Sequence, residues 1–174
     1  MTDDAPSQRP DAVIEIDPML FRKVMGHFPT GVTVVASQAG GRPVGLAIGS
    51  FFSVSLDPPL VGFCVATGSS TWPVMSEVGS FGVSVLAEDQ HETSGQFASK
   101  MADKFEGIAW EPAVVTGSPL IHGAVAHIDC ELYDQFVEGD HVVVIGSVRA
   151  LDIHRDDVGP LLFFKGGYGR HTSI

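Results

Sequence analysis

Residues 45–65 read GLAIGSFFSVSLDPPLVGFCV and contain the pattern that decides the fold. Two runs of β-branched, aromatic and small residues, 44–55 and 60–66, flank the turn Asp57-Pro58-Pro59. Short apolar runs bounded by turn residues are typical of β-strands. We therefore expect strands on both sides of a tight turn.

Short apolar runs bounded by turn residues also occur on both sides of this stretch. Further strands are predicted over 31–37, 81–87 and 141–148, and shorter ones over 124–136 and 161–164. The strands follow one another through short turns, and helices are interspersed without strict βαβ alternation. The pattern therefore favours a mainly β fold, an antiparallel Greek-key barrel with peripheral helices, over a doubly wound sheet.

Four helices are predicted around these strands. The first has Asp17 as its N-cap and Pro18 as its first residue, and it ends within 26–31. Its apolar face consists of Leu20, Phe21, Val24 and Met25. The other helices are expected over 71–78, with Thr71 as N-cap, over 88–99 and over 101–105.

Length and composition set the class of protein. The chain has 174 residues, of which 44% are hydrophobic and 18% charged, so we expect one folded domain over 12–174 after a disordered leader over 1–11. The formal net charge of −11 argues against binding to nucleic acid or to an anionic membrane surface. No apolar run reaches the length of a membrane span, and the acidic N-terminus is not a signal peptide, so a cytoplasmic location is expected.

Motifs of several enzyme classes are missing from the sequence. There is no GxSxG, no HExxH, no Walker A and no GxGxxG after a strand. His122 and His127 are expected on opposite faces of one strand, so no metal site is predicted. Cys64 and Cys130 lie in apolar stretches without metal spacing and are expected to be buried free thiols.

A hydroxyl-rich stretch without basic residues is the first candidate for function. No Lys or Arg occurs over 43–99, and Ser69-Ser70-Thr71 precede a predicted helix. Backbone amides, hydroxyls and a helix N-terminus together bind anions, with Lys100 and Lys104 as the nearest following cations. Simple capping of the helix also explains these hydroxyls, and the spacing alone favours it. In the second candidate, the turn Gly139-Asp140 delivers His141 to the start of an apolar strand, which also fits an ordinary hairpin.

The motifs in combination resemble the short-chain flavin reductases, the small components of two-component flavin-dependent monooxygenases. The resemblance spans about 18–170 and rests on seven segments. They are FPTGVTVVAS (28–37), GLAIGSFFSVSLDPPLVGFCV (45–65), SSTW (69–72), FGVSVLAEDQ (81–90), QFASKMADKFEGIAW (96–110), GDH (139–141) and PLLFFKGGYG (160–169). It implies an FMN-binding split β-barrel, a homodimer, FMN or FAD as flavin, and NADH or NADPH as hydride donor.

The resemblance also implies roles for individual residues. The flavin groove is expected to consist of Ala47, Ile48, Gly49, Ser50, Ser53, Val54 and Ser55. The ring is expected to border Cys64, Val65 and Ala66 and to be approached by Pro29, Thr30 and Gly31. The phosphate is assigned to Ser69, Ser70 and Thr71, with Ser99 and Lys104 closing over it. His141 is placed beside the nicotinamide as the catalytic candidate, and Tyr168 at the mouth of the groove.

The reaction implied is hydride transfer from nicotinamide to flavin, which needs no protein nucleophile. Many relatives carry a Thr and a polar residue where this chain has Ala47 and Gly49, which either loosens flavin binding or shifts it to backbone groups. Reduced flavin is expected to reach a partner monooxygenase. A flavin- or haem-binding carrier and an electron-transfer flavoprotein that keeps its FMN remain alternatives.

Overall fold

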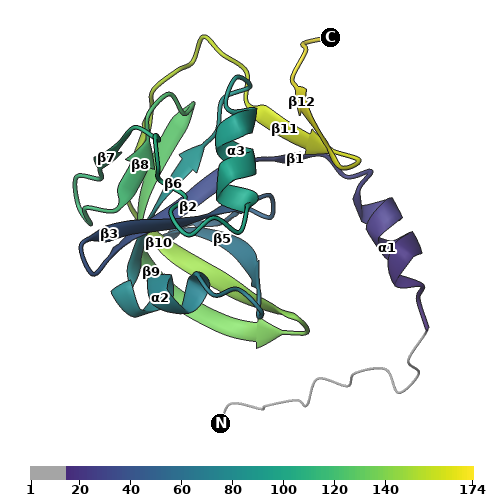
Figure 1. The fold of residues 1–174 in the computed structure, drawn as a ribbon, viewed down its shortest axis with the longest axis horizontal. Coiled ribbons are helices and arrows are strands. Elements are labelled where there is room, and N and C mark those ends of the chain that lie inside the picture. Colours follow the sequence, from purple (N-terminus) through teal and green to yellow (C-terminus); the bar gives the residue numbers. More distant parts are fainter. Residues whose placement is uncertain (1–14) are drawn as a thin grey trace.

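Seven antiparallel strands form the main sheet of the computed structural model, which describes residues 15–174 (Figure 1). Their order across the sheet is β3 (Arg42–Ile48), β2 (Thr33–Ala39), β6 (Ser80–Val85), β9 (Ala126–Glu138), β10 (His141–Ile153), β5 (Pro59–Ala66) and β4 (Phe52–Leu56). The mainly β, antiparallel prediction is confirmed. The predicted leader over 1–11 lies outside the described residues.

Two smaller sheets and three helices complete the described part of the chain. One sheet contains β1 (Thr30–Gly31), β11 (Leu161–Phe164) and β12 (Gly167–Arg170), and the other pairs β7 (Trp110–Pro112) with β8 (Pro119–Ile121). The helices are α1 (Pro18–Met25), α2 (Trp72–Val78) and α3 (His91–Ala98). None of the described helices is long and apolar enough to cross a membrane.

Two predicted elements differ from the structure. The run over 44–55 is divided between β3 and β4, because the chain turns between Ile48 and Phe52. Residues 101–105 form turns rather than a helix, since the Asp103 carboxylate accepts a hydrogen bond from the Phe105 backbone N–H (2.9 Å). A local Asx turn of this kind competes with helix formation.

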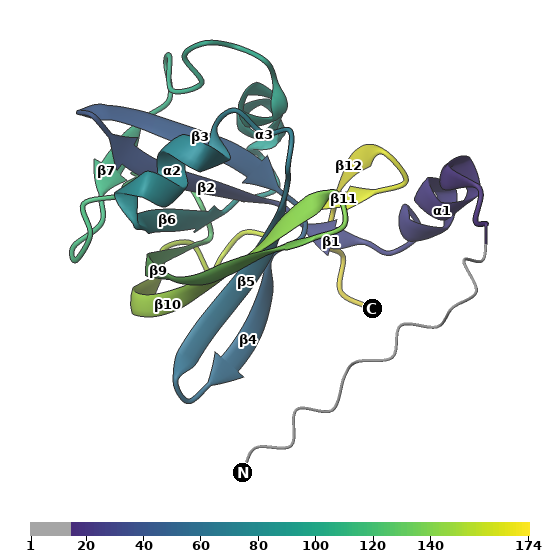
Figure 2. The ribbon, with the colours of Figure 1, turned by 90° about the horizontal axis from the view of Figure 1, so that it is seen from below.

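Strand β2 separates two hydrophobic clusters. Val35 faces a cluster that contains Phe63 and Phe81, whereas Val34 and Ala36 face a cluster that contains Phe97. Successive strand residues point to opposite faces, so β2 is buried on both sides. Helix α2 lies beside β2 and β6 in Figure 2, and α3 contacts β2 and β3.

The first cluster is centred on Phe63, a fully buried residue of β5. Its ring meets those of Trp72 and Phe81 edge-on, with centroid distances of 5.5 and 5.3 Å. Such pairs add to the free energy gained by burying the rings. The contact with Trp72 fixes α2 against the sheet and therefore the loop that leads into this helix.

Helix α1 begins as predicted but does not pack as its sequence suggests. The Asp17 carboxylate accepts a hydrogen bond from the Met19 backbone N–H (2.8 Å). Its apolar side chains are all exposed, and the helix projects away from the main sheet (Figures 1 and 2). The structure therefore leaves an apolar helix face without cover from the described part of the chain.

Both cysteines are free, as predicted. Cys130 is fully buried, and this burial, together with the charge of Asp129, raises the pKa of its thiol to about 12. Cys64 is only partly buried, which differs from the expectation that both thiols are enclosed.

Candidate functional site

A cavity of about 650 Å³ lies where the segment after α1 meets the turn between β3 and β4. Among the predicted site residues, it is lined by Pro29, Thr30, Gly31, Gly49 and Ser50. Residues almost twenty positions apart come together because β1 pairs with β11 while β2 pairs with β3. The structure thus unites two segments that the sequence assigned to one site.

A second, smaller hollow shares Gly49 and Phe163 with this cavity. It includes Ala47, Ile48 and Tyr168, so three more predicted residues lie beside the first group. The Tyr168 hydroxyl donates a hydrogen bond to Ser94 Oγ on α3 (2.9 Å). Tyr168 therefore lines the smaller hollow and links β12 to α3.

Gly49 is the point at which the two hollows meet. A Cβ atom added there would lie 3.2 Å from Thr30 Oγ1, closer than an ordinary van der Waals contact. The lack of a side chain therefore leaves room beside Thr30 where the two linings meet. A side chain at this position would require Thr30 to shift.

Ser50 connects the cavity to strand β5. Its hydroxyl accepts a hydrogen bond from the Cys64 backbone N–H (2.9 Å) and donates one to the Cys64 carbonyl (3.1 Å). The neighbouring Val65 side chain is buried in the first cluster. Only backbone groups of Val65 are thus available to a ligand.

His141 is the first residue of β10 and lies beside the C-terminal end of β5. It pairs in register with Ala66, and the Thr67 backbone N–H donates to the Asp140 carbonyl (2.9 Å). The exposed His141 ring places Nδ1 2.7 Å from Asp140 Oδ1, and this hydrogen bond lowers the pKa of the Asp140 carboxyl. The imidazole is therefore oriented by its own neighbour and remains accessible.

The loop before α2 places the N-cap at Thr71, as predicted, but Ser69 provides the hydrogen-bonding side chain. The Ser69 hydroxyl accepts hydrogen bonds from the backbone N–H groups of Thr71 (3.3 Å) and Trp72 (3.2 Å). Thr71, which was predicted to be the N-cap, makes no capping hydrogen bond with its side chain. Ser69 is thus occupied in capping, while Ser70 is exposed.

Ser99 and Lys104 follow α3, and both donate hydrogen bonds to carbonyl groups near its C-terminal end. The Ser99 hydroxyl donates to the Gln96 carbonyl (2.7 Å), and the Lys104 ammonium donates to the Phe97 carbonyl (2.8 Å). Burial lowers the pKa of Lys104. No hydrogen bond between described residues joins Lys104 to Ser69, Ser70 or Thr71.

Three predicted residues lie on β4, outside the lining of the two hollows. Ser53 and Ser55 pair with Val61 and Leu60 of β5, and an irregularity in the ladder occurs at Val54. Ser53 and Val54 are exposed and Ser55 is half-buried. They extend from the cavity edge along the outer strand of the sheet.

Comparison with known proteins identifies the family. Residues 25–172 match the model of the flavin reductase like domain. The chain belongs to this family. It is 47% identical to a flavin reductase of Pseudomonas putida, covering 91% of this chain and 93% of that protein. It is 44% identical to the reductase subunit HsaB of a flavin-dependent monooxygenase from Mycobacterium tuberculosis, covering 88% and 82%.

A solved flavin reductase has the same fold. The NADH:FAD oxidoreductase SgcE6 of Streptomyces globisporus, in complex with NAD and FAD fragments, is 36% identical and has a TM-score of 0.84. The match covers 92% of this chain and 98% of that chain. The resemblance read from the sequence motifs is therefore confirmed.

The cavity of this flavin reductase has an aromatic lining. Its lining combines small residues with four phenylalanines. The sequence motifs contained these rings, but only Tyr168 was singled out. The missed aromatic residues are Phe28, Phe51, Phe52 and Phe163. Alternation along a strand could have indicated Phe52 and Phe163, whereas the loop residues carry no comparable signal.

Lys165 was also missed. It lines the same cavity, its backbone N–H donates to the Gly26 carbonyl (2.8 Å), and its φ of 51° places it in the left-handed region. Its ammonium lies over the Phe164 ring, 5.1 Å from the centroid. Nothing in the sequence distinguishes this turn lysine from a surface lysine that lines no cavity.

A separate cluster also escaped the sequence analysis. One ligand atom from each of Glu111, His127 and His154 lies within 4.8 Å of the others. The premise that His122 and His127 occupy one strand is wrong, because β9 begins only at Ala126. The argument from strand faces therefore no longer applies, and the three residues form a group that could hold a metal ion.

Ser50 is predicted to stabilise the fold as well as border the cavity. Ser50→Ala should lower the free energy of unfolding by about 1 kcal/mol, because it removes two hydrogen bonds to Cys64. Ser53→Ala is the matched control, an exposed serine on the neighbouring strand, and should change stability by less than about 0.5 kcal/mol. Urea unfolding without flavin provides the measurement. Equal stability of the two variants would contradict a bracing role.

Proposed function

We propose that this flavin reductase transfers hydride from NADH or NADPH to FMN or FAD and supplies the reduced flavin to a separate monooxygenase. The enzyme class follows from the family and from relatives that cover most of the chain. The carrying observation is the cavity between Thr30 and Gly49, which is apolar, aromatic-lined and open at a glycine. Cytoplasm, where both nicotinamides are available, is the location proposed.

The proposed ligand positions follow from the shape and chemistry of the lining. The isoalloxazine ring is assigned to the cavity bordered by Gly31, Gly49 and Ser50. Cys64 and Ala66 are assigned to the border of the same ring. Because neither Ala47 nor Gly49 offers a side-chain hydrogen bond, the backbone of this segment serves as donor and acceptor. The phosphate is assigned to the loop at Ser70, with Lys104 as its cation.

The flavin and the nicotinamide, when bound, would supply the hydride-transfer chemistry, so the chain needs no nucleophile or acid–base pair of its own. The residues contribute by holding two flat rings in contact and by excluding alternative orientations. His141 is exposed and oriented by Asp140, so we assign it to positioning of the nicotinamide. It pairs with Ala66 at the C-terminal end of β5, two residues after Cys64, which is hydrogen-bonded to Ser50 of the cavity lining.

A homodimer accounts for the exposed apolar surface near the cavity. The apolar side chains of α1 are exposed, and Met25 at its end lines the cavity together with the exposed Phe28. Large contiguous apolar patches on soluble proteins are usually covered by a partner. A second copy of this chain is the proposed cover, and the cavity would then border the subunit interface.

Lys104 is predicted to contribute to flavin affinity. Lys104→Glu should weaken flavin binding by about 1–3 kcal/mol, roughly 5- to 150-fold in Kd, which is the scale of a charge-assisted hydrogen bond. Lys100→Glu, an identical change of charge at an exposed neighbour, is the control. Fluorescence titration with FMN and FAD measures both, and thermal unfolding without flavin reveals any loss of fold. Equal affinities in the two variants would remove Lys104 from the phosphate site.

His141 is predicted to act on hydride transfer rather than on flavin affinity. In anaerobic stopped-flow experiments, NADH should bleach the flavin absorbance of the wild type, and His141→Ala should slow reduction or raise the NADH KM by roughly 10- to 100-fold. His171→Ala is the control histidine. A wild-type protein that binds flavin and leaves it oxidised would be a carrier instead. Wild-type rates in His141→Ala would remove only the positioning role.

The dimer is predicted to depend on α1. Sedimentation velocity at micromolar concentration should give a species of twice 18.4 kDa. A charged residue on the apolar face, in Phe21→Lys, should shift the species toward the monomer, whereas Val114→Lys, at a residue that is 88% exposed, should not. A wild type that sediments only at 18.4 kDa would refute the proposal.

A further inference from the structure

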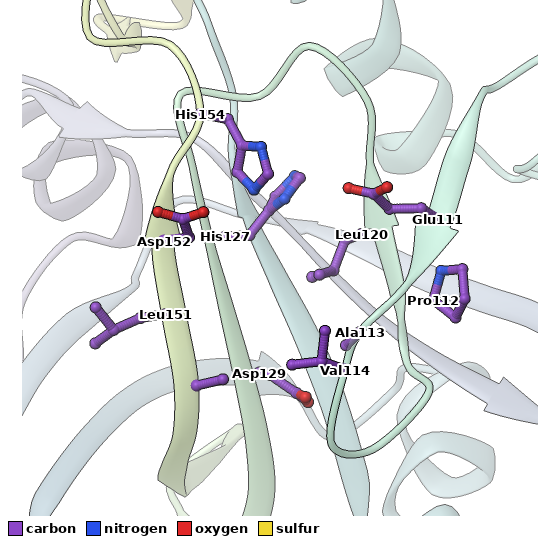
Figure 3. A pocket seen from close by; sticks show the side chains of 11 residues that line it. Glu111, Pro112, Ala113, Val114, Leu120, His127, Asp129, Leu151, Asp152 and His154 are labelled. Carbon is purple, nitrogen blue, oxygen red and sulfur yellow. The ribbon is translucent and has the colours of Figure 1, made fainter.

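We propose that Glu111, His127 and His154 form a binding site for one divalent transition-metal ion of the zinc class. The three residues come from β7, from β9 and from the segment just after β10. They line a cavity of about 370 Å³ that shares no residue with the flavin cavity. Figure 3 shows the His127 ring between the ring of His154 and the carboxylate of Glu111.

His127 provides the decisive observation. The side chain is only 4% exposed, and its Nδ1 is buried without a hydrogen-bond partner among the described residues. A buried polar atom of this kind carries a free-energy cost unless something binds it. A metal ion at Nδ1 would satisfy it.

The other nitrogen of the same ring fixes its chemical form. His127 Nε2 lies 2.8 Å from the Ile121 carbonyl oxygen, and a carbonyl can only accept, so Nε2 carries the hydrogen. Nδ1 then presents its lone pair. A histidine that donates one N–H to a backbone carbonyl while the other nitrogen faces the metal is the usual arrangement in metalloproteins.

The other two ligands are close and able to adjust. The His154 and His127 rings have centroids 4.2 Å apart, and the ligand atoms of the three residues lie within 4.8 Å of one another. Around zinc, with bonds of about 2.0–2.1 Å, tetrahedral ligands lie about 3.3 Å apart. Glu111 and His154 are exposed and can rotate inward to close this difference.

The neighbouring polar groups support this ligand set. His122 Nε2 lies 3.8 Å from Glu111 Oε2, and His122 can hold or replace that ligand. Asp129 also lines the cavity, but its carboxylate accepts hydrogen bonds from the backbone N–H groups of Val115 (2.9 Å) and Thr116 (3.1 Å). Asp129 is therefore occupied and outside the set.

The donor types select the ion. Two imidazole nitrogens with one carboxylate suit zinc and its neighbours in the first transition row. Calcium and magnesium prefer all-oxygen sites, and the absence of a thiolate disfavours copper(I). A bound ion would tie the β7–β8 hairpin to β9 and to the end of β10, so we expect it to stabilise this side of the fold.

Zinc titration of the chelator-stripped full chain tests the site. The wild type should bind one Zn²⁺ per chain and gain about 5–10 °C in Tm at a hundredfold excess over Kd. His154→Ala and Glu111→Gln change exposed side chains, so the fold should survive, and each should weaken zinc binding at least 10-fold. His171→Ala should bind as the wild type does.

The outcomes separate a built site from weak surface binding. Co²⁺ in place of zinc should give visible absorption in the wild type that His154→Ala abolishes. Failure of the wild type to bind zinc stoichiometrically would overturn the proposal, and so would equal affinity in His154→Ala, Glu111→Gln and His171→Ala. Flavin affinity should be unchanged in all four proteins, because the two cavities share no residue.

Discussion

The burial of β2 on both faces is the constraint on which the rest of the structure depends. Its side chains alternate between the cluster around Phe63 and the cluster around Phe97, so a slip of one residue would exchange every contact on both sides. The Thr33 hydroxyl adds a buried hydrogen bond to the Ile48 carbonyl (3.1 Å). The register of β2 against β3 is therefore fixed at the end where the proposed flavin cavity lies.

This register positions the site. Because Thr33 pairs with Ile48, the chain before β2 and the turn after β3 leave the sheet side by side, and Thr30 meets Gly49. Strand β5, held by Phe63 in the same cluster, then presents Cys64 to Ser50. The hydrophobic core thus supports the surface to which the flavin and nicotinamide rings are assigned. The protein's contribution to hydride transfer is to position these two rings.

Local patterns were sufficient to predict the long strands and the N-cap at Asp17, whereas the segments that line the cavity were assigned to one site through the family resemblance. The short strands β7, β8 and β12 are too short for a periodic pattern of hydrophobic residues. The helix predicted over 101–105 does not form, because Asp103 makes a local turn instead. The sequence carried less information about which residues, distant along the chain, lie close together in the fold. Glu111, His127 and His154 converge only through β-pairing and hairpin packing, and the exposure of α1 is visible only once the main sheet is built. Lys104 and Ser69, which look like free ligands in the sequence, are partly occupied by helix ends.

Flavin affinity of Gly49→Ala tests the central claim, that the register of β2 and β3 opens the cavity in which the flavin ring binds. The added Cβ would lie 3.2 Å from Thr30 Oγ1, whereas Gly95→Ala, on the exposed side of α3, meets no atom within 4 Å. We expect Gly49→Ala to raise the Kd for flavin at least 10-fold, about 1.4 kcal/mol, while Gly95→Ala leaves it unchanged. Equal, wild-type affinity in both folded variants would contradict the account and move the ring elsewhere on the molecule.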